Sequence, residues 1–139
     1  GRILLTGGFR GENDGPTDVI SIYDPSTSTI KQIGKLLQAR AEHSCLQINS
    51  YQVLIVGGRI EKFSFANPGE TTGIVELVDL KDGKSKLSQI IVAGGEPFVI
   101  RDDNKDIFVI GGFYKTSSWG DTRWHGNITK LTIPRDQVD

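Results

Sequence analysis

The chain has 139 residues and a mass of 15.2 kDa, which suits one domain and can bury a hydrophobic core without a disulfide or a metal. The 16 Lys and Arg side chains nearly balance the 17 Asp and Glu side chains, so the net charge of −1 indicates neither a nucleic-acid nor a membrane partner. The longest apolar run is about five residues, too short for a transmembrane helix. One cysteine excludes an internal disulfide and a multi-cysteine zinc site. Because the chain lacks methionine and begins at Gly1, we expect a processed product or a fragment.

Three apolar segments of one kind recur along the chain, at residues 3–6, 53–56 and 107–110. Their apolar and largely β-branched composition predicts buried strands. Each segment ends in two glycines, which permit positive φ and stop a strand sharply. These pairs are Gly7 and Gly8, Gly57 and Gly58, and Gly111 and Gly112.

The residues that follow each glycine pair also repeat. Polar loops at 9–17, 59–72 and 113–125 precede alternating strands at 18–24, 73–79 and 126–132. Turn residues at 24–27 and 82–83 then lead into short strands at 29–33 and 86–91. Strands at 43–48 and 97–100 return the chain, through turns at 49–50 and 102–104, to the next glycine pair. We therefore expect ten strands, in groups of three, four and three. No segment has a sustained helical period, so we expect essentially no helix.

The order of these features resembles the Kelch repeat, in its bacterial style, over nearly the whole chain. The resemblance rests on residues 21–27, on Arg40 and His43, and on the glycine pairs and the strand 76–79. It implies an all-β fold of Kelch-type β-propeller blades, each a four-stranded antiparallel sheet. Residues 1–139 would form one partial propeller domain of about two and a half repeats, with blade parts 1–37, 38–92 and 93–139. An unrelated β-sandwich is the alternative fold.

The sequence departs from the Kelch pattern at several places. The tryptophan that Kelch blades carry on the last strand is replaced near Ile30 and Leu87. The third unit has glycines at 94 and 95 where the Arg and His of the pattern would stand. The first unit also lacks its inner strand and the third its outer strand. Resembling propellers close with about four to eight blades, so fewer than three blades would leave two apolar faces open. Remaining propeller blades or a second copy of the chain would have to cover them.

Loops on one face of a rigid propeller are expected to bind a partner. Trp, Tyr and Arg are enriched at binding hot spots, and the third loop holds both tryptophans of the chain. The predicted partner-binding residues are Tyr114, Trp119, Arg123, Trp124 and His125, with Arg59 and Phe63 from the second loop. The competing interpretations are that the tryptophans fold back over an open blade face and that the second loop is a simple hairpin extension.

Other residues are expected to have structural roles. The resemblance implies that Arg40 and His43 tie neighbouring blades together by hydrogen bonds, with Glu76 in the network. Cys45 shares a strand face with His43, but a cysteine on an apolar strand is usually inert. Residues 102–106 carry oxygen ligands at alternate positions but lack the glycine and glutamate of a calcium loop, so they predict a turn. We expect no metal and no cofactor.

These observations favour a non-enzymatic binding or scaffold module that takes a protein or glycan partner. One alternative is a piece of a propeller enzyme, either galactose-oxidase-like or sugar-processing. The segment His43-Ser44-Cys45 is loosely similar to the cysteine-bearing strand of the oxidase, but Val78 stands where its tyrosine would be. A further alternative is a purely structural piece of an assembly. The single cysteine leaves the cellular compartment open.

Overall fold

The computed structural model describes residues 1–11, 14–62, 69–91, 94–114 and 123–133. Within these residues the chain forms twelve strands and no helix, and every strand pairing is antiparallel. The predicted all-β fold is therefore confirmed. With no helix among the described residues, none of them provides an apolar helix that could cross a bilayer.

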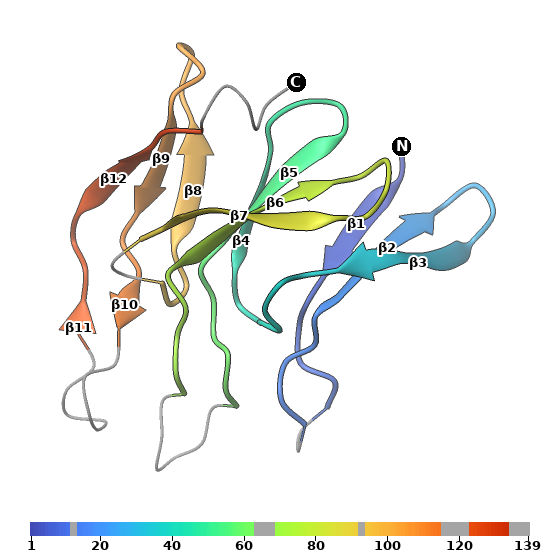
Figure 1. Ribbon diagram of the computed structural model, residues 1–139, viewed down its shortest axis with the longest axis horizontal. Coiled ribbons are helices and arrows are strands. Elements are labelled where there is room, and N and C mark those ends of the chain that lie inside the picture. The colour runs from blue at the N-terminus through green and yellow to red at the C-terminus, as the bar shows by residue number, and fades with distance from the viewer. Residues whose placement is uncertain (12–13, 63–68, 92–93, 115–122, 134–139) are drawn as a thin grey trace.

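Ten of the strands form three sheets that fan out side by side in Figure 1. Sheet I has the order β1-β2-β3, with β1 at Ile3–Thr6, β2 at Val19–Asp24 and β3 at Thr29–Lys35. Sheet II has the order β4-β5-β6-β7, with bounds Ser44–Gln47, Gln52–Val56, Ile74–Asp79 and Ser85–Ile90. Sheet III has the order β12-β9-β8, with β8 at Phe98–Arg101, β9 at Ile107–Ile110 and β12 at Ile128–Leu131.

One pair of strands was not expected from the sequence. The third loop, predicted as irregular from 113 to 125, contains a short hairpin of β10 (Phe113–Tyr114) and β11 (Arg123–Trp124). Phe113 lies opposite Trp124 in this hairpin, and their rings are in contact with centroids 5.0 Å apart. A cross-strand aromatic pair of this kind stabilises a two-residue ladder that is too short to give a sequence period.

The turns between strands are formed by side chains that bond to the backbone two residues ahead. Asp24 accepts hydrogen bonds from the backbone nitrogen of Ser26 at 2.9 Å and from its hydroxyl at 2.6 Å. Both bonds favour the carboxylate, so they lower the pKa of Asp24 below its ordinary value. Asp102 accepts a bond from the backbone nitrogen of Asp106, four residues ahead, so the 102–106 segment forms a turn.

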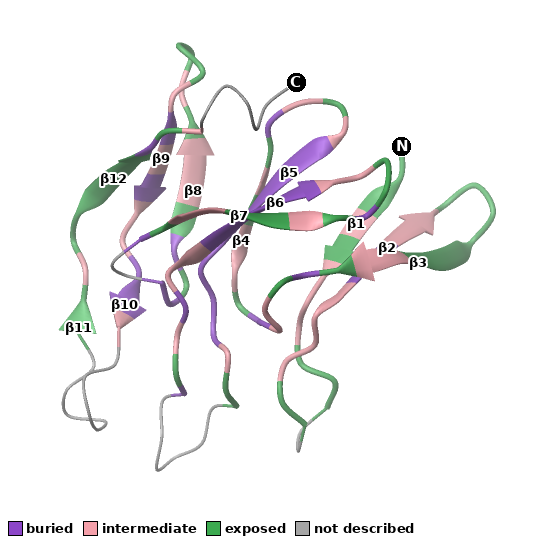
Figure 2. Cartoon of the chain, viewed as in Figure 1, coloured by how far each residue is buried: buried purple, intermediate pink, exposed green. Residues whose placement is uncertain are grey.

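The hydrophobic core lies between the sheets, in two clusters. Ile20 of sheet I packs with Val53, Ile55 and Val78 of sheet II. The opposite face of sheet II, with Leu54 at its centre, packs on sheet III. Every residue of β5 is buried, whereas the strands of sheets I and III are largely intermediate or exposed (Figure 2). Sheet II is thus the middle layer, and sheets I and III each cover one of its faces.

Candidate binding surface

The three glycine pairs turn the chain out of equivalent strands at the same end of the molecule (Figure 1). All six glycines have positive φ; at Gly57 and Gly58 the values are 64° and 107°. A Cβ at Gly57 would overlap with the carbonyl oxygen of Gly94, and one at Gly58 would overlap with that of Ala41. Only glycine therefore permits this close approach between β5 and its neighbouring linkers. The three loops that follow the glycine pairs therefore leave the sheets at this one end of the molecule, which we call the loop end.

Arg59 is the centre of a cluster of charged and aromatic side chains at this end. Its guanidinium forms ion pairs with the carboxylates of Glu42 and Glu96, the latter at 2.6 Å. It also lies 4.8 Å from the ring centroid of Phe113, a favourable cation–π geometry. The Arg59 side chain is only 11% exposed, whereas Glu42 and Glu96 are 41% and 40% exposed. The cluster therefore fixes one cation in place and presents two half-exposed carboxylates to solvent.

Both glutamates of the cluster have a backbone conformation that is unusual for a residue with a side chain. The φ of Glu42 is 54° and that of Glu96 is 46°. Left-handed backbone costs a non-glycine residue about 1–2 kcal/mol. The two residues occupy the same place in successive linkers, just before β4 and β8, so the strain is repeated. Strained residues of this kind concentrate at functional sites.

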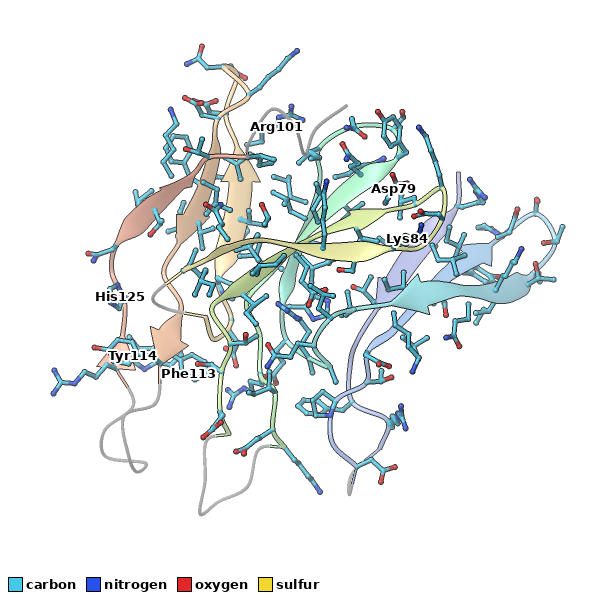
Figure 3. The ribbon with its side chains drawn as sticks, viewed as in Figure 1. Asp79, Lys84, Arg101, Phe113, Tyr114 and His125 are labelled. Atoms are coloured by element: carbon cyan, nitrogen blue, oxygen red, sulfur yellow. The ribbon has the colours of Figure 1, made fainter. Side chains whose placement is uncertain are left out.

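Aromatic side chains extend the cluster towards solvent. Phe113 is buried, while Trp124, which packs on it at an interplanar angle of 55°, is 71% exposed. Tyr114 and His125 form a second ring contact with centroids 5.5 Å apart. Figure 3 shows Phe113, Tyr114 and His125 together at the β10–β11 hairpin. These rings form an aromatic array in which Phe113 is buried and Trp124 is exposed to solvent.

The predicted binding residues are distributed as follows. The structure brings Arg59, Tyr114, Trp124 and His125 to the loop end, and Arg123 lies opposite Tyr114 in the hairpin. Phe63 and Trp119 lie outside the described residues. Sequence reasoning missed Glu42, Glu96 and Phe113 as members of the cluster. The signal that could have identified the glutamates is their shared place before two equivalent strands.

A second polar network ties the linker after sheet I to sheet II, and its two charged side chains, Arg40 and Glu76, are fully buried. The Glu76 carboxylate is ion-paired with Arg40 and accepts hydrogen bonds from the backbone nitrogens of Leu37 at 2.8 Å and Gln38 at 3.1 Å. The Ser85 hydroxyl donates to the same carboxylate. Arg40 and Glu76 of this network are two of the residues for which the Kelch resemblance implied a tie between neighbouring blades.

Arg40 also bonds to the backbone of sheet II. It donates to the carbonyl oxygens of Gly57 at 2.9 Å and Ile74 at 2.8 Å. Burial lowers the pKa of the guanidinium, and the Glu76 carboxylate opposes that shift. With all these partners, the buried charge of Arg40 is compensated, as a stable fold requires.

His43 and Cys45 lie beside this network, where burial favours the uncharged form of each side chain. His43 is bonded through Nε2 to the Thr6 hydroxyl at 2.8 Å, and burial together with the nearby Arg40 charge lowers its pKa to about 4. Cys45 is exposed on one side, yet the surrounding protein desolvates its thiol and raises the pKa. The imidazole is therefore neutral and the thiol protonated at neutral pH, and the protonated thiol is the unreactive form. Among the described residues, no group of three or more His, Cys, Asp or Glu side chains is placed to hold a metal ion.

The comparisons with known proteins concern the fold alone. No family model matches the sequence, and no curated protein matches it. A solved structure of YjhT is similar to this chain with a TM-score of 0.67 and 14% sequence identity. The match covers 81% of this chain and 35% of the YjhT chain, so the present chain spans about a third of the length of that protein. At this identity the likeness supports a shared arrangement of antiparallel sheets, and it carries no information about activity.

Proposed function

We propose that the three sheets are blades of a Kelch-type β-propeller and that the loop end binds a protein or glycan partner without catalysis. The strand grouping of three, four and three, the three glycine pairs and the two sheet-on-sheet cores support the propeller architecture. The fold similarity to YjhT supports the arrangement of antiparallel sheets on which this proposal builds.

The observation that carries the binding role is the array of Arg59, Phe113 and Trp124. Buried Phe113 contacts both Arg59 and Trp124, so a rigid base positions a tryptophan that is 71% exposed. A large ring held in place before binding loses little conformational entropy when a partner covers it. Exposed aromatic edges beside carboxylates suit a sugar ring or a protein side chain equally, because both offer apolar surface together with hydrogen-bond donors.

The test begins with the 139-residue chain applied to a glycan array and to an array of folded proteins. Each ligand found is then titrated against wild-type protein, Trp124→Ala and the control Leu37→Ala, whose side chain is exposed in the linker after sheet I. We expect Trp124→Ala to weaken binding by at least about tenfold, the usual effect of removing an interface anchor. Its melting temperature should stay within about 2 °C of wild type, because little Trp124 surface is buried.

Two results would contradict the proposal. If Trp124→Ala binds each ligand as well as wild type does, the ring array is not the binding surface. If Trp124→Ala unfolds, the tryptophan has the alternative role of covering the sheet, and the chain fits a purely structural piece of an assembly.

A further inference from the structure

Sheet III has an apolar face that points away from sheet II. Val109 and Leu131 pack in the core with sheet II, so their neighbours along each strand face the other way. The register places Phe98, Ile110 and Ile128 in one row across the sheet, and Ile100, Phe108 and Lys130 in the next. Phe98 is 63% exposed and Ile128 is 65% exposed. We name this surface face III; its apolar members are Phe98, Ile100, Phe108, Ile110 and Ile128, and Lys130, which is ion-paired with Asp106 at 2.6 Å, lies at its edge on β12.

Sheet I has a second apolar face that points away from sheet II on the opposite side of the molecule. Leu4 and Ile20 contribute to the core with sheet II, so the alternate residues face outward. The register pairs Ile3 with Tyr23 and Tyr23 with Ile30, and places Leu5 opposite Ser21. The exposed apolar side chains Ile3, Leu5 and Ile30, together with Tyr23, form face I, whose strands are green and pink in Figure 2.

The glycine pairs give a common register for β1, β5 and β9, and this register shows that the two faces are of different types. Three residues before the first glycine stand Leu4, Leu54 and Phe108. Leu4 packs forward onto sheet II and Leu54 packs forward onto sheet III. The surfaces that receive them contain equivalent residues, Val53 and Ile55 in sheet II and Ile107 and Val109 in sheet III. We call the face of a sheet that carries the position of Leu4 and Leu54 its forward face, and the opposite face its backward face. At both junctions the forward face of one sheet packs onto the backward face of the next sheet along the chain.

Among the described residues, no other sheet packs on face I or on face III. Face III contains Phe108 and is a forward face, whereas face I contains Ile3 and Leu5, the equivalents of Val53 and Ile55, and is a backward face. We propose that face III of one copy of this chain packs on face I of a second copy, which continues the packing already present between sheets I, II and III. The contact is head-to-tail and uses two different surfaces, so it gives a closed dimer or a longer head-to-tail series. It depends on the sheet faces alone and is independent of the binding role of the loop end.

Association is measured by light scattering of the 139-residue chain over a dilution series. We expect wild-type protein to reach at least twice the 15.2 kDa mass of one chain. Leu5→Lys places a charge in face I and Phe98→Lys places one in face III; either change should weaken association roughly 100-fold, because an unpaired charge would be buried. The control Leu37→Lys alters an apolar side chain that is 58% exposed in the linker after sheet I, and it should associate as wild type does.

A mixture of the two variants tests the head-to-tail geometry directly. Leu5→Lys retains a normal face III and Phe98→Lys retains a normal face I, so one intact contact forms between unlike chains. The mixture should therefore contain a two-chain species, although each variant alone stays at the mass of one chain. If each face paired with itself, every pair of unlike chains would bring an altered face against an intact one, and mixing would restore nothing.

The proposal is wrong if wild-type protein stays monomeric at all concentrations, if the variants associate as wild type does, or if mixing restores no association. Circular dichroism of each variant establishes that it is folded. Where Leu5→Lys or Phe98→Lys is unfolded, the more exposed Ile30→Lys and Ile128→Lys change the same two faces and take its place. A partner supplied by further sheets of the same kind would appear as a monomeric wild-type chain, and that outcome also overturns the assignment to a second copy.

Discussion

The buried pair of Arg40 and Glu76 gives the sharpest prediction for stability. Both side chains have 0% exposure, and Glu76 also accepts two backbone bonds and the Ser85 hydroxyl. The variant Glu76→Leu removes the negative charge and leaves the Arg40 cation buried without its counter-ion. Breaking a buried pair in this way costs about 3–5 kcal/mol of the free energy of unfolding. Because a domain has only about 5–15 kcal/mol in total, Glu76→Leu should be close to its unfolding threshold at room temperature.

The reverse change and the double variant separate the pair from its surroundings. Arg40→Met leaves a buried carboxylate that keeps its two backbone bonds, so we expect a loss of about 3 kcal/mol. In the double variant no charge remains, although three donors of the Glu76 site lose their acceptor. The double variant should therefore be about 2–3 kcal/mol more stable than the sum of the single losses predicts.

The assay is urea unfolding followed by circular dichroism, with the slope m checked for each variant. The matched control is Lys35→Met, which breaks a surface ion pair with Asp18 at 3.4 Å and should cost less than about 1 kcal/mol. A loss below about 1 kcal/mol for Glu76→Leu, or strictly additive losses in the double variant, would refute the reasoning. Either result would mean that the pair does not hold the junction between sheets I and II.

Two other predictions concern pH and backbone packing. The pKa of His43 is about 4 in the folded chain against an ordinary 6.5, so the unfolded chain binds a proton between these values that the folded chain does not bind. Lowering the pH from 7 to 4 should therefore cost wild-type protein about 3 kcal/mol more than His43→Gln in urea unfolding, and equal losses in both proteins would contradict this role. A Cβ at residue 94 would overlap with the carbonyl oxygen of Thr72, so Gly94→Ala should lose about 1–3 kcal/mol. Gly126→Ala, where nothing lies within 4 Å, should stay within about 0.5 kcal/mol of wild type, and similar melting of the two variants would argue against the steric effect.

The strands of the three sheets could be predicted because each has a local signal. The glycine pairs mark the ends of β1, β5 and β9, and the observed bounds differ from the predicted ones by only a few residues. The β10–β11 hairpin could not be predicted in the same way. Its two ladder pairs join residues on either side of a polar stretch, and a two-residue strand shows no alternation. The contacts that hold it form only in the fold: the ring contact between Phe113 and Trp124 and the backbone bond from His125 to Gly112.

The candidate site was predicted in its aromatic part and missed in its acidic part. Trp124 and Tyr114 could be selected by residue type, because large aromatic residues in a loop are unusual and favour binding. Glu42 and Glu96 resembled ordinary surface glutamates, since pairing with Arg59 depends on three segments that meet only in the fold. Their positive φ adds to the difficulty, because left-handed backbone is expected at glycine rather than glutamate.

The two junctions between sheets are closed by different means, and this difference explains why the repeat is imperfect at Gly94. In both junctions the second glycine of a pair donates a backbone hydrogen bond to a carbonyl oxygen of the linker. Gly8 donates to Arg40 at the first junction, and Gly58 donates to Gly94 at the second. At the first junction the Arg40 side chain then reaches the Glu76 carboxylate.

The strand position equivalent to Glu76 in sheet III is Thr129, which is exposed and carries no charge. An arginine at position 94 would therefore have no carboxylate at that position, and its Cβ would already overlap with Thr72. Arg59 supplies the guanidinium at the second junction instead, from the loop side, where Glu96 pairs with it. The charge that is buried for stability at the first junction is thus moved to the loop end at the second, where its partner carboxylates remain in contact with solvent.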